Sequence, residues 1–207
     1  MRKMIVLITA AVFLSAVAGL ALFSSTGSPK PIVLTAPVFG DKEAPVELVL
    51  FEDYKCYACR IFSTNILPQI ISEYLATNRI RLKIVPLGFL HGSKVLANAA
   101  LEVCRLAPEQ FIPYSKRIFA RFESTDVDES TGDILLALAK ENGNIDLKKL
   151  KTCIEQQCHY FELDRYLGKA KSLMRQNVHI PALYVNGVRV STSDYEAIKQ
   201  EIERAEK

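Results

Sequence analysis

The sequence has little of what marks several common classes of protein. Five cysteines in 207 residues are too few for a fold held together mainly by disulfides. The three histidines, His91, His159 and His179, fit no catalytic-triad or metal-ligand pattern. Lysine and arginine are dispersed and the net charge is only +3, so no basic surface for nucleic acid is expected. Low-complexity runs and internal repeats are also absent after the N-terminal segment, which leaves a globular protein whose chemistry depends on a few residues.

Residues 1–28 are predicted to be a signal peptide or an N-terminal anchor. Arg2 and Lys3 form a short basic start, and residues 4–23 are apolar with few interruptions before a small polar stretch. The run is long for a signal peptide and just long enough to span a bilayer. In either form the leader delivers the domain outside the cytoplasm, so we expect an exported, periplasmic protein, retained at the inner membrane if the leader is not cleaved. The compartment is then oxidising.

Cys56 and Cys59 form the most informative motif in the chain. They follow a hydrophobic run that is predicted to be a strand, Val46–Phe51, and open a helical pattern that extends from about Tyr57 to Leu75. A thiol at a helix N-terminus has its pKa lowered from about 8.5 into roughly the 3.5–7.5 range, because backbone N–H groups and the helix dipole stabilise the thiolate. The second thiol lies one turn away, so the pair can alternate between dithiol and disulfide.

Two cysteines at this spacing can also form half of a zinc site. Zinc needs a second pair of ligands nearby, and the only candidate in the sequence is Cys158-His159, whose two residues are adjacent. Because Cys56 and Cys59 lie between a predicted strand and a predicted helix, redox chemistry is favoured over metal binding.

The order of predicted elements indicates an α/β protein. A second strand alternates apolar and charged residues at Ile80–Val85, and a helical pattern then continues from residue 93 to about residue 177. The chain ends with a hairpin around Asn186-Gly187 and a helix that starts near Ser193. Pro68 lies inside the first helix and should kink it. These patterns predict a sheet divided in sequence by an all-helical insertion.

Three runs of the sequence, residues 40–46 (GDKEAPV), 51–60 (FEDYKCYACR) and 180–187 (IPALYVNG), resemble the DsbA-like thiol–disulfide oxidoreductases, the disulfide bond formation protein family. The resemblance extends from Gly40 to the C-terminus. It implies an α/β thioredoxin fold with an inserted all-helical domain. The thioredoxin-like domain would occupy residues 29–207, as residues 29–91 and 178–207, with the helical insertion at about 92–177.

The resemblance also implies roles for the site residues. Cys56 would be the exposed catalytic nucleophile and Cys59 its buried catalytic partner. Pro181 would follow a cis peptide bond beside the pair, with the backbone of Ile180 turned toward an extended substrate. Tyr57 and Ala58 would line the same substrate groove with Ile180 and Pro181. No cofactor and no metal are implied.

The other three cysteines lie in the helical insertion. Family members often carry an extra pair at the positions of Cys104 and Cys153, so the resemblance implies a structural disulfide between these two. Cys153–Cys158 is the rival pairing, which is feasible if the helix breaks between them. With Cys104–Cys153 formed, Cys158 would be the cysteine left over.

The predicted function is the introduction of disulfide bonds into other exported proteins by a monomer. Its substrates would be unfolded or reduced exported proteins, and family analogy implies reoxidation by a quinone-linked, DsbB-like membrane protein. Tyr57 and Ala58 replace the proline or histidine often found between the cysteines, so a milder oxidant than the strongest family members is expected. The alternatives are a periplasmic reductase or isomerase and a non-catalytic module that binds metal through the thiols.

Overall fold

The computed structural model describes residues 31–122, 127–128 and 130–207. The predicted signal peptide or anchor, residues 1–28, lies outside these residues. Among the helices that the structure describes, none combines the length and apolar character needed to cross a lipid bilayer.

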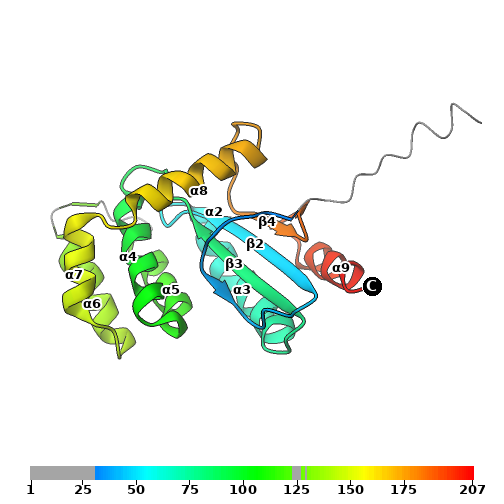
Figure 1. Ribbon diagram of the computed structural model, residues 1–207, viewed down its shortest axis with the longest axis horizontal. Helices are drawn as coiled ribbons and strands as arrows, with labels where there is room; N and C mark the ends of the chain where they lie inside the picture. The colour runs from blue at the N-terminus through cyan, green and yellow to red at the C-terminus, as the bar shows by residue number, and fades with distance from the viewer. Residues whose placement is uncertain (1–30, 123–126, 129) are drawn as a thin grey trace, which may run out of the picture. The chain divides into compact units, whose positions relative to one another are not determined.

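The described residues form a five-stranded mixed sheet with the strand order β1-β3-β2-β4-β5 (Figure 1). β2 pairs in parallel with β3 and antiparallel with β4. All seven residues of β2 are buried, which explains why the sequence of this central strand is a nearly continuous apolar run. The strands are β1 (Val38–Phe39), β2 (Val46–Glu52), β3 (Ile80–Pro86), β4 (Ala182–Val185) and β5 (Val188–Val190).

A helical segment connects β2 to β3, as two parallel neighbouring strands require. It consists of α2 (Tyr57–Ile61), the π-helix η1 (Phe62–Ile66), α3 (Leu67–Ile70) and the π-helix η2 (Ile71–Leu75). Pro68 is the second residue of α3 and has no N–H for a bond to the preceding turn. The irregularity expected at Pro68 therefore takes the form of a change between π-helical and α-helical turns.

The helical insertion lies between β3 and β4 in the sequence (Figure 1). Its first helix, α4, packs against the other long helices of the insertion, and its residues 96–103 are all buried. The last helix, α8, packs against β3 and leads the chain back to the sheet. The helices are α4 (Ser93–Leu106), the 3-10 helix η3 (Pro108–Gln110), α5 (Phe111–Phe122), α6 (Thr131–Asn142), α7 (Leu147–Gln156) and α8 (Tyr160–Leu173).

The C-terminal elements also follow the sequence pattern. Asn186 and Gly187 have φ angles of 45° and 85°, which suit the primed turn that joins β4 to β5. The final helix, α9 (Tyr195–Ala205), begins where the Asp194 side chain accepts a hydrogen bond from the Ala197 N–H. The predicted order of strands, helical insertion, hairpin and helix is confirmed.

Candidate active site

Cys56 is the N-cap residue of α2, and three residues separate it from Glu52, the end of the buried central strand β2. Its sulfur accepts a hydrogen bond from the Cys59 N–H at 3.3 Å. Hydrogen bonds from the Cys59 side chain and from backbone N–H groups of α2 lower the pKa of Cys56 to about 7, although burial and the charge of Asp53 oppose them. The local structure therefore stabilises a thiolate at this position, as the position of the motif predicted.

Cys59 has the opposite environment. Its side chain is fully buried within the first turn of α2. Burial raises the pKa of Cys59 far above its ordinary value, and the hydrogen bond to Cys56 and the charges of Cys56 and Glu52 act in the same direction. The motif thus contains one acidic, partly accessible thiol and one that holds its proton.

Ile180 and Pro181 bring a distant part of the chain to Cys56. The Ile180–Pro181 peptide bond is cis, as the resemblance implied. The thiol of Cys56 donates to the carbonyl oxygen of Ile180 at a sulfur–oxygen distance of 3.8 Å. The backbone just before β4 consequently lies beside the thiol.

Two acidic residues at the end of β2 complete the polar surroundings. Glu52 is 1% exposed, and burial, with the charges of Asp53 and Cys56, raises its pKa to about 8. Its Oε2 atom has no hydrogen-bond partner among the residues that the structure describes. The negative charge of Asp53 raises the pKa of Cys56 and so opposes the thiolate. The sequence did not indicate a proton-holding role for Glu52.

Asp53 also has a structural role that the sequence did not reveal. Its Oδ2 atom accepts hydrogen bonds from the Phe89 N–H at 2.8 Å, the Leu90 N–H at 3.2 Å and the Ser93 hydroxyl at 2.8 Å. These bonds connect the end of β2 to the loop after β3 and to the first residue of α4. The insertion is thereby fixed next to the cysteine pair.

A cavity of about 440 Å³ lies beside the motif. Tyr57, which is 64% exposed, stands at this cavity, and the guanidinium of Arg60 lies 5.2 Å from the centre of its ring. Three of the predicted groove residues, Tyr57, Ala58 and Pro181, line the cavity, while Ile180 approaches Cys56 through its carbonyl group. The lining residues are Tyr57, Ala58, Ile61, Phe62, Asn65, Ile66, Pro181, Thr192 and Ser193.

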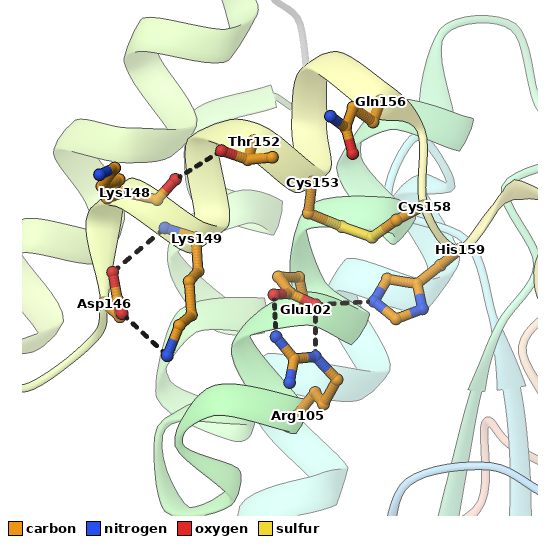
Figure 2. A pocket seen from close by; sticks show the side chains of 10 residues that line it. All are labelled: Glu102, Arg105, Asp146, Lys148, Lys149, Thr152, Cys153, Gln156, Cys158 and His159. Atoms are coloured by element: carbon orange, nitrogen blue, oxygen red, sulfur yellow. Dashed lines mark hydrogen bonds and ion pairs between the residues drawn. A yellow bond between two sulfur atoms is a disulfide. The ribbon is translucent and has the colours of Figure 1, made fainter.

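Cys56 and Cys59 belong to no cluster of metal-ligating side chains in the described part of the chain. The one such cluster found there consists of Glu102, Cys153, Cys158 and His159, at a different cavity (Figure 2).

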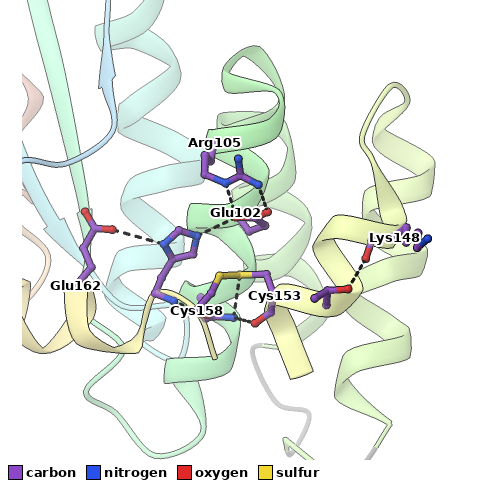
Figure 3. Close-up of a disulfide and its surroundings, with 9 residues drawn as sticks. Glu102, Arg105, Lys148, Cys153, Cys158 and Glu162 are labelled. Carbon is purple, nitrogen blue, oxygen red and sulfur yellow. Dashed lines mark hydrogen bonds and ion pairs between the residues drawn. A yellow bond between two sulfur atoms is a disulfide. The ribbon is translucent and has the colours of Figure 1, made fainter. Parts of the chain in front are cut away.

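The predicted Cys104–Cys153 disulfide is wrong. Cys153 is bonded to Cys158, with 5.2 Å between their Cα atoms (Figure 3). Cys104 is a free thiol. α7 ends at Gln156, and Gln157 takes a left-handed conformation with a φ of 55°, so the chain turns back and the Cys158 N–H donates to the Cys153 carbonyl at 3.3 Å. The break that the rival pairing required is present.

The comparisons with known proteins agree with this geometry. A model of the thioredoxin family matches residues 33–204. The chain belongs to this family. Disulfide bond formation protein D of Bacillus subtilis (strain 168) is 29% identical to it over 182 residues, which are 86% of this chain and 80% of that protein.

Two solved structures of disulfide-forming proteins are similar to this chain over most of its length. The crystal structure of oxidised BdbD from Bacillus subtilis has a TM-score of 0.77 and 28% identity, and the match covers 86% of this chain and 97% of that one. DsbA from Chlamydia trachomatis has a TM-score of 0.76 and 25% identity, with 83% of this chain and 92% of that one covered. The protein is a DsbA-like thiol–disulfide oxidoreductase with a thioredoxin fold, and the predicted fold class is confirmed.

Proposed function

We propose that this oxidoreductase is exported and introduces disulfide bonds into other exported proteins through Cys56 and Cys59. The observation that carries the proposal is the hydrogen bond from the Cys59 N–H to the Cys56 sulfur at the start of α2. It stabilises the thiolate of the reduced enzyme, and a more stable reduced form makes the disulfide form a stronger oxidant.

The reaction starts with the Cys56–Cys59 disulfide. A substrate thiolate attacks the Cys56 sulfur, because Cys56 is the accessible member of the pair, and forms a mixed disulfide. The bond between the two enzyme sulfurs breaks, and Cys59 leaves with the electron pair and takes a proton. Glu52, with a pKa raised to about 8, is a nearby group that can supply this proton at neutral pH.

A second substrate thiolate then attacks the substrate sulfur of the mixed disulfide. The substrate leaves with its new disulfide, and Cys56 leaves as the thiolate that α2 stabilises. Two electrons pass from the substrate to the enzyme. A DsbB-like membrane oxidoreductase would remove them and regenerate the disulfide.

The cavity beside the motif supports binding of unfolded chains. Its walls are largely apolar side chains from α2, η1 and the segment at Pro181, and they continue to exposed Tyr57. The Ile180 backbone lies next to Cys56, where an extended substrate can align its cysteine with the enzyme sulfur. Because apolar and main-chain contacts of this kind give little sequence preference, we propose that the substrates are reduced, unfolded exported proteins. We also propose that the enzyme acts as a monomer.

The equilibrium reduction potential of the Cys56/Cys59 couple, measured against glutathione, tests the direction of the reaction. Since Tyr57 and Ala58 place no imidazolium beside Cys56, we expect a value between about −120 mV and about −200 mV, that of a moderate oxidant. A value near −270 mV would identify a reductant and refute the proposal. Oxidation of a reduced two-cysteine peptide should be lost in Cys56→Ser and kept in Cys104→Ser.

A further inference from the structure

A second group of reactive side chains lies in the helical insertion, apart from Cys56 and Cys59. Glu102, Cys153, Cys158 and His159 each offer one ligand atom, and these atoms all lie within 4.8 Å of one another. They face a cavity of about 540 Å³ (Figure 2). In the disulfide form the two sulfurs are bonded to each other and cannot both serve as thiolate ligands.

The fold holds these four side chains in place through α4. The side chain of Asn98, which is fully buried, donates to the Cys153 carbonyl at 3.1 Å and accepts from the His159 N–H at 2.9 Å. Both ends of the short turn that carries Cys158 are therefore fixed by one residue. Glu102, one helical turn further along α4, is only 2% exposed. These two bonds are made to backbone groups, so reduction of the disulfide does not by itself remove them; Asn98 also donates to the Cys153 sulfur at 3.9 Å.

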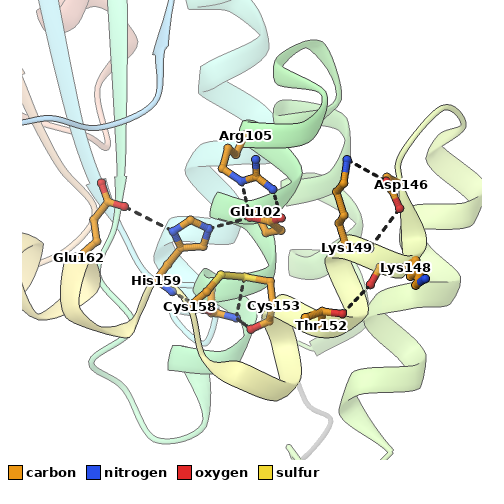
Figure 4. A network of polar contacts seen from close by, with 11 residues as sticks. Glu102, Arg105, Asp146, Lys148, Lys149, Thr152, Cys153, Cys158, His159 and Glu162 are labelled. Atoms are coloured by element: carbon orange, nitrogen blue, oxygen red, sulfur yellow. Dashed lines mark hydrogen bonds and ion pairs between the residues drawn. A yellow bond between two sulfur atoms is a disulfide. The ribbon is translucent and has the colours of Figure 1, made fainter.

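The imidazole of His159 lies between two carboxylates, and its Nε2 atom is hydrogen-bonded to Glu102. Its Nε2 atom lies 3.0 Å from Glu102 Oε2, and its Nδ1 atom lies 3.5 Å from Glu162 Oε2 (Figure 4). Histidines that bind metals usually donate the second ring N–H to a carboxylate, which fixes the tautomer and the ring. Glu162 occupies that position here, so Nε2 is the nitrogen directed at the cluster.

The donor set suits zinc. Two thiolates, one imidazole nitrogen and one carboxylate oxygen are the ligand types that Zn²⁺ takes in four-coordinate sites. A Zn²⁺ ion with two thiolates and Glu102 carries a net charge of −1, and the Arg105 guanidinium, bonded to Glu102, balances it. A disulfide that serves only as a covalent crosslink has no need of a buried carboxylate and an oriented imidazole beside its sulfurs.

We propose that the dithiol form of this cluster binds one Zn²⁺ ion through Cys153, Cys158, His159 and Glu102, and that metal and disulfide exclude each other. A dithiol reductant supplies two electrons and two protons to the Cys153–Cys158 bond and leaves as its own disulfide. Zn²⁺ then replaces the two thiol protons, which pass to solvent. The newly made chain, before it is oxidised, is in the same dithiol form.

The test uses the full chain with Cys56→Ser, Cys59→Ser and Cys104→Ser, which leaves Cys153 and Cys158 as the only cysteines. Serine retains the N-cap of α2. After reduction and removal of the reductant without oxygen, Co²⁺ is titrated as a spectroscopic probe. We expect one equivalent to bind, with the visible bands of tetrahedral cobalt and thiolate-to-cobalt charge-transfer absorption, and Zn²⁺ to displace it. Absence of the charge-transfer band would refute the proposal.

The matched control is the same polypeptide with the Cys153–Cys158 disulfide formed, which should bind no Co²⁺. Equal binding of Co²⁺ by the oxidised and reduced forms would contradict the proposal that metal and disulfide exclude each other. His159→Ala should weaken Zn²⁺ binding by at least about tenfold, whereas His91→Ala, at an exposed histidine outside the cluster, should leave it unchanged. If His159→Ala binds as tightly as its parent, the ligand set is wrong.

A measurement without substitutions in the cluster guards against variants that fail to fold. Zn²⁺ should slow the alkylation of Cys158, the exposed sulfur of the pair, by at least about tenfold in the reduced protein, because a bound thiolate is a poorer nucleophile. An unchanged alkylation rate would contradict the proposal. All of these proteins lack Cys56 and Cys59, so the outcome does not depend on the proposed oxidase activity.

Discussion

The sulfur of Cys56 lies 3.8 Å from the carbonyl oxygen of Ile180, although 124 positions separate the two residues. The pairing of β2 with β4 produces this contact, because Phe51 and Ala182 are partners across the two strands. The complete helical insertion lies between them in the sequence. The site therefore forms only when the two parts of the thioredoxin-like domain come together.

The first prediction concerns the unequal reactivity of the two cysteines. With glutathione disulfide, and with Cys104→Ser in the background, Cys59→Ser should form a stable mixed disulfide at Cys56. Cys56→Ser should react at least about tenfold more slowly, because Cys59 is buried and its pKa is raised. Mass spectrometry of samples taken over time measures both rates. Equal rates would show that the two thiols do not differ as described.

The second prediction concerns Glu52 and pH. In the unfolded chain this carboxyl ionises at about pH 4.5, whereas burial raises its pKa in the folded protein to about 8. The folded protein binds more protons between these values, so the Glu52 contribution to the free energy of unfolding decreases as the pH rises through this window. Glu52→Gln should therefore be more stable than its parent by roughly 2–4 kcal/mol at about pH 9, and the gain should disappear near pH 4.

Urea denaturation of the two oxidised proteins at both pH values measures this difference. The oxidised form is used so that Cys56 and Cys59 do not titrate. A gain that is the same at both pH values would contradict the raised pKa of Glu52.

The third prediction separates the two roles of Asp53. Asp53→Asn removes a negative charge that raises the pKa of Cys56, so Cys56 should ionise at lower pH. It also weakens the bonds to Phe89, Leu90 and Ser93, and the free energy of unfolding should decrease by about 1–3 kcal/mol. Thiolate absorbance and urea denaturation measure the two effects. Glu43→Gln, at an exposed acid, is the control and should change neither. A higher Cys56 pKa in Asp53→Asn would be inconsistent with this electrostatic account.

The fourth prediction follows from the corrected disulfide. Cys153 and Cys158 are five positions apart and close a short loop, so Cys153→Ser should reduce the free energy of unfolding of the oxidised protein by roughly 2 kcal/mol. Cys104→Ser should cost less than about 1 kcal/mol, because Cys104 is a free, half-buried thiol. Peptide mapping of Cys104→Ser should still find the Cys153–Cys158 bond, and its loss would contradict the structure.

Local patterns in the sequence predicted the features that depend on neighbouring residues. The apolar run at Val46–Phe51 became the buried central strand, and Asn186-Gly187 became the hairpin turn. The helix N-cap position of Cys56 could also be predicted, because a strand ends shortly before it and a helical pattern begins directly after it.

The features that could not be predicted from the sequence depend on the backbone conformation of a single residue or on contacts between distant residues. The left-handed conformation of Gln157 decides which cysteine meets Cys153. Glutamine has no marked preference for this conformation, so the sequence does not predict it. Glu102 and His159 meet across 57 positions, so the spacing of Cys158 and His159 alone gave no sign of a metal-ligand cluster. The contacts of Asp53 with the loop after β3 are likewise set by tertiary structure.

An ultraviolet titration of the reduced protein tests the central claim most directly. Burial raises the pKa of Cys104 to about 11, and that of Cys59 is also raised. With the Cys153–Cys158 disulfide kept intact, absorbance that develops near neutral pH therefore belongs to Cys56. We expect thiolate absorbance with a midpoint at about pH 7, and its absence in Cys56→Ser. A midpoint above about pH 8.5, the value of an ordinary cysteine, would contradict the claim that the fold makes Cys56 acidic.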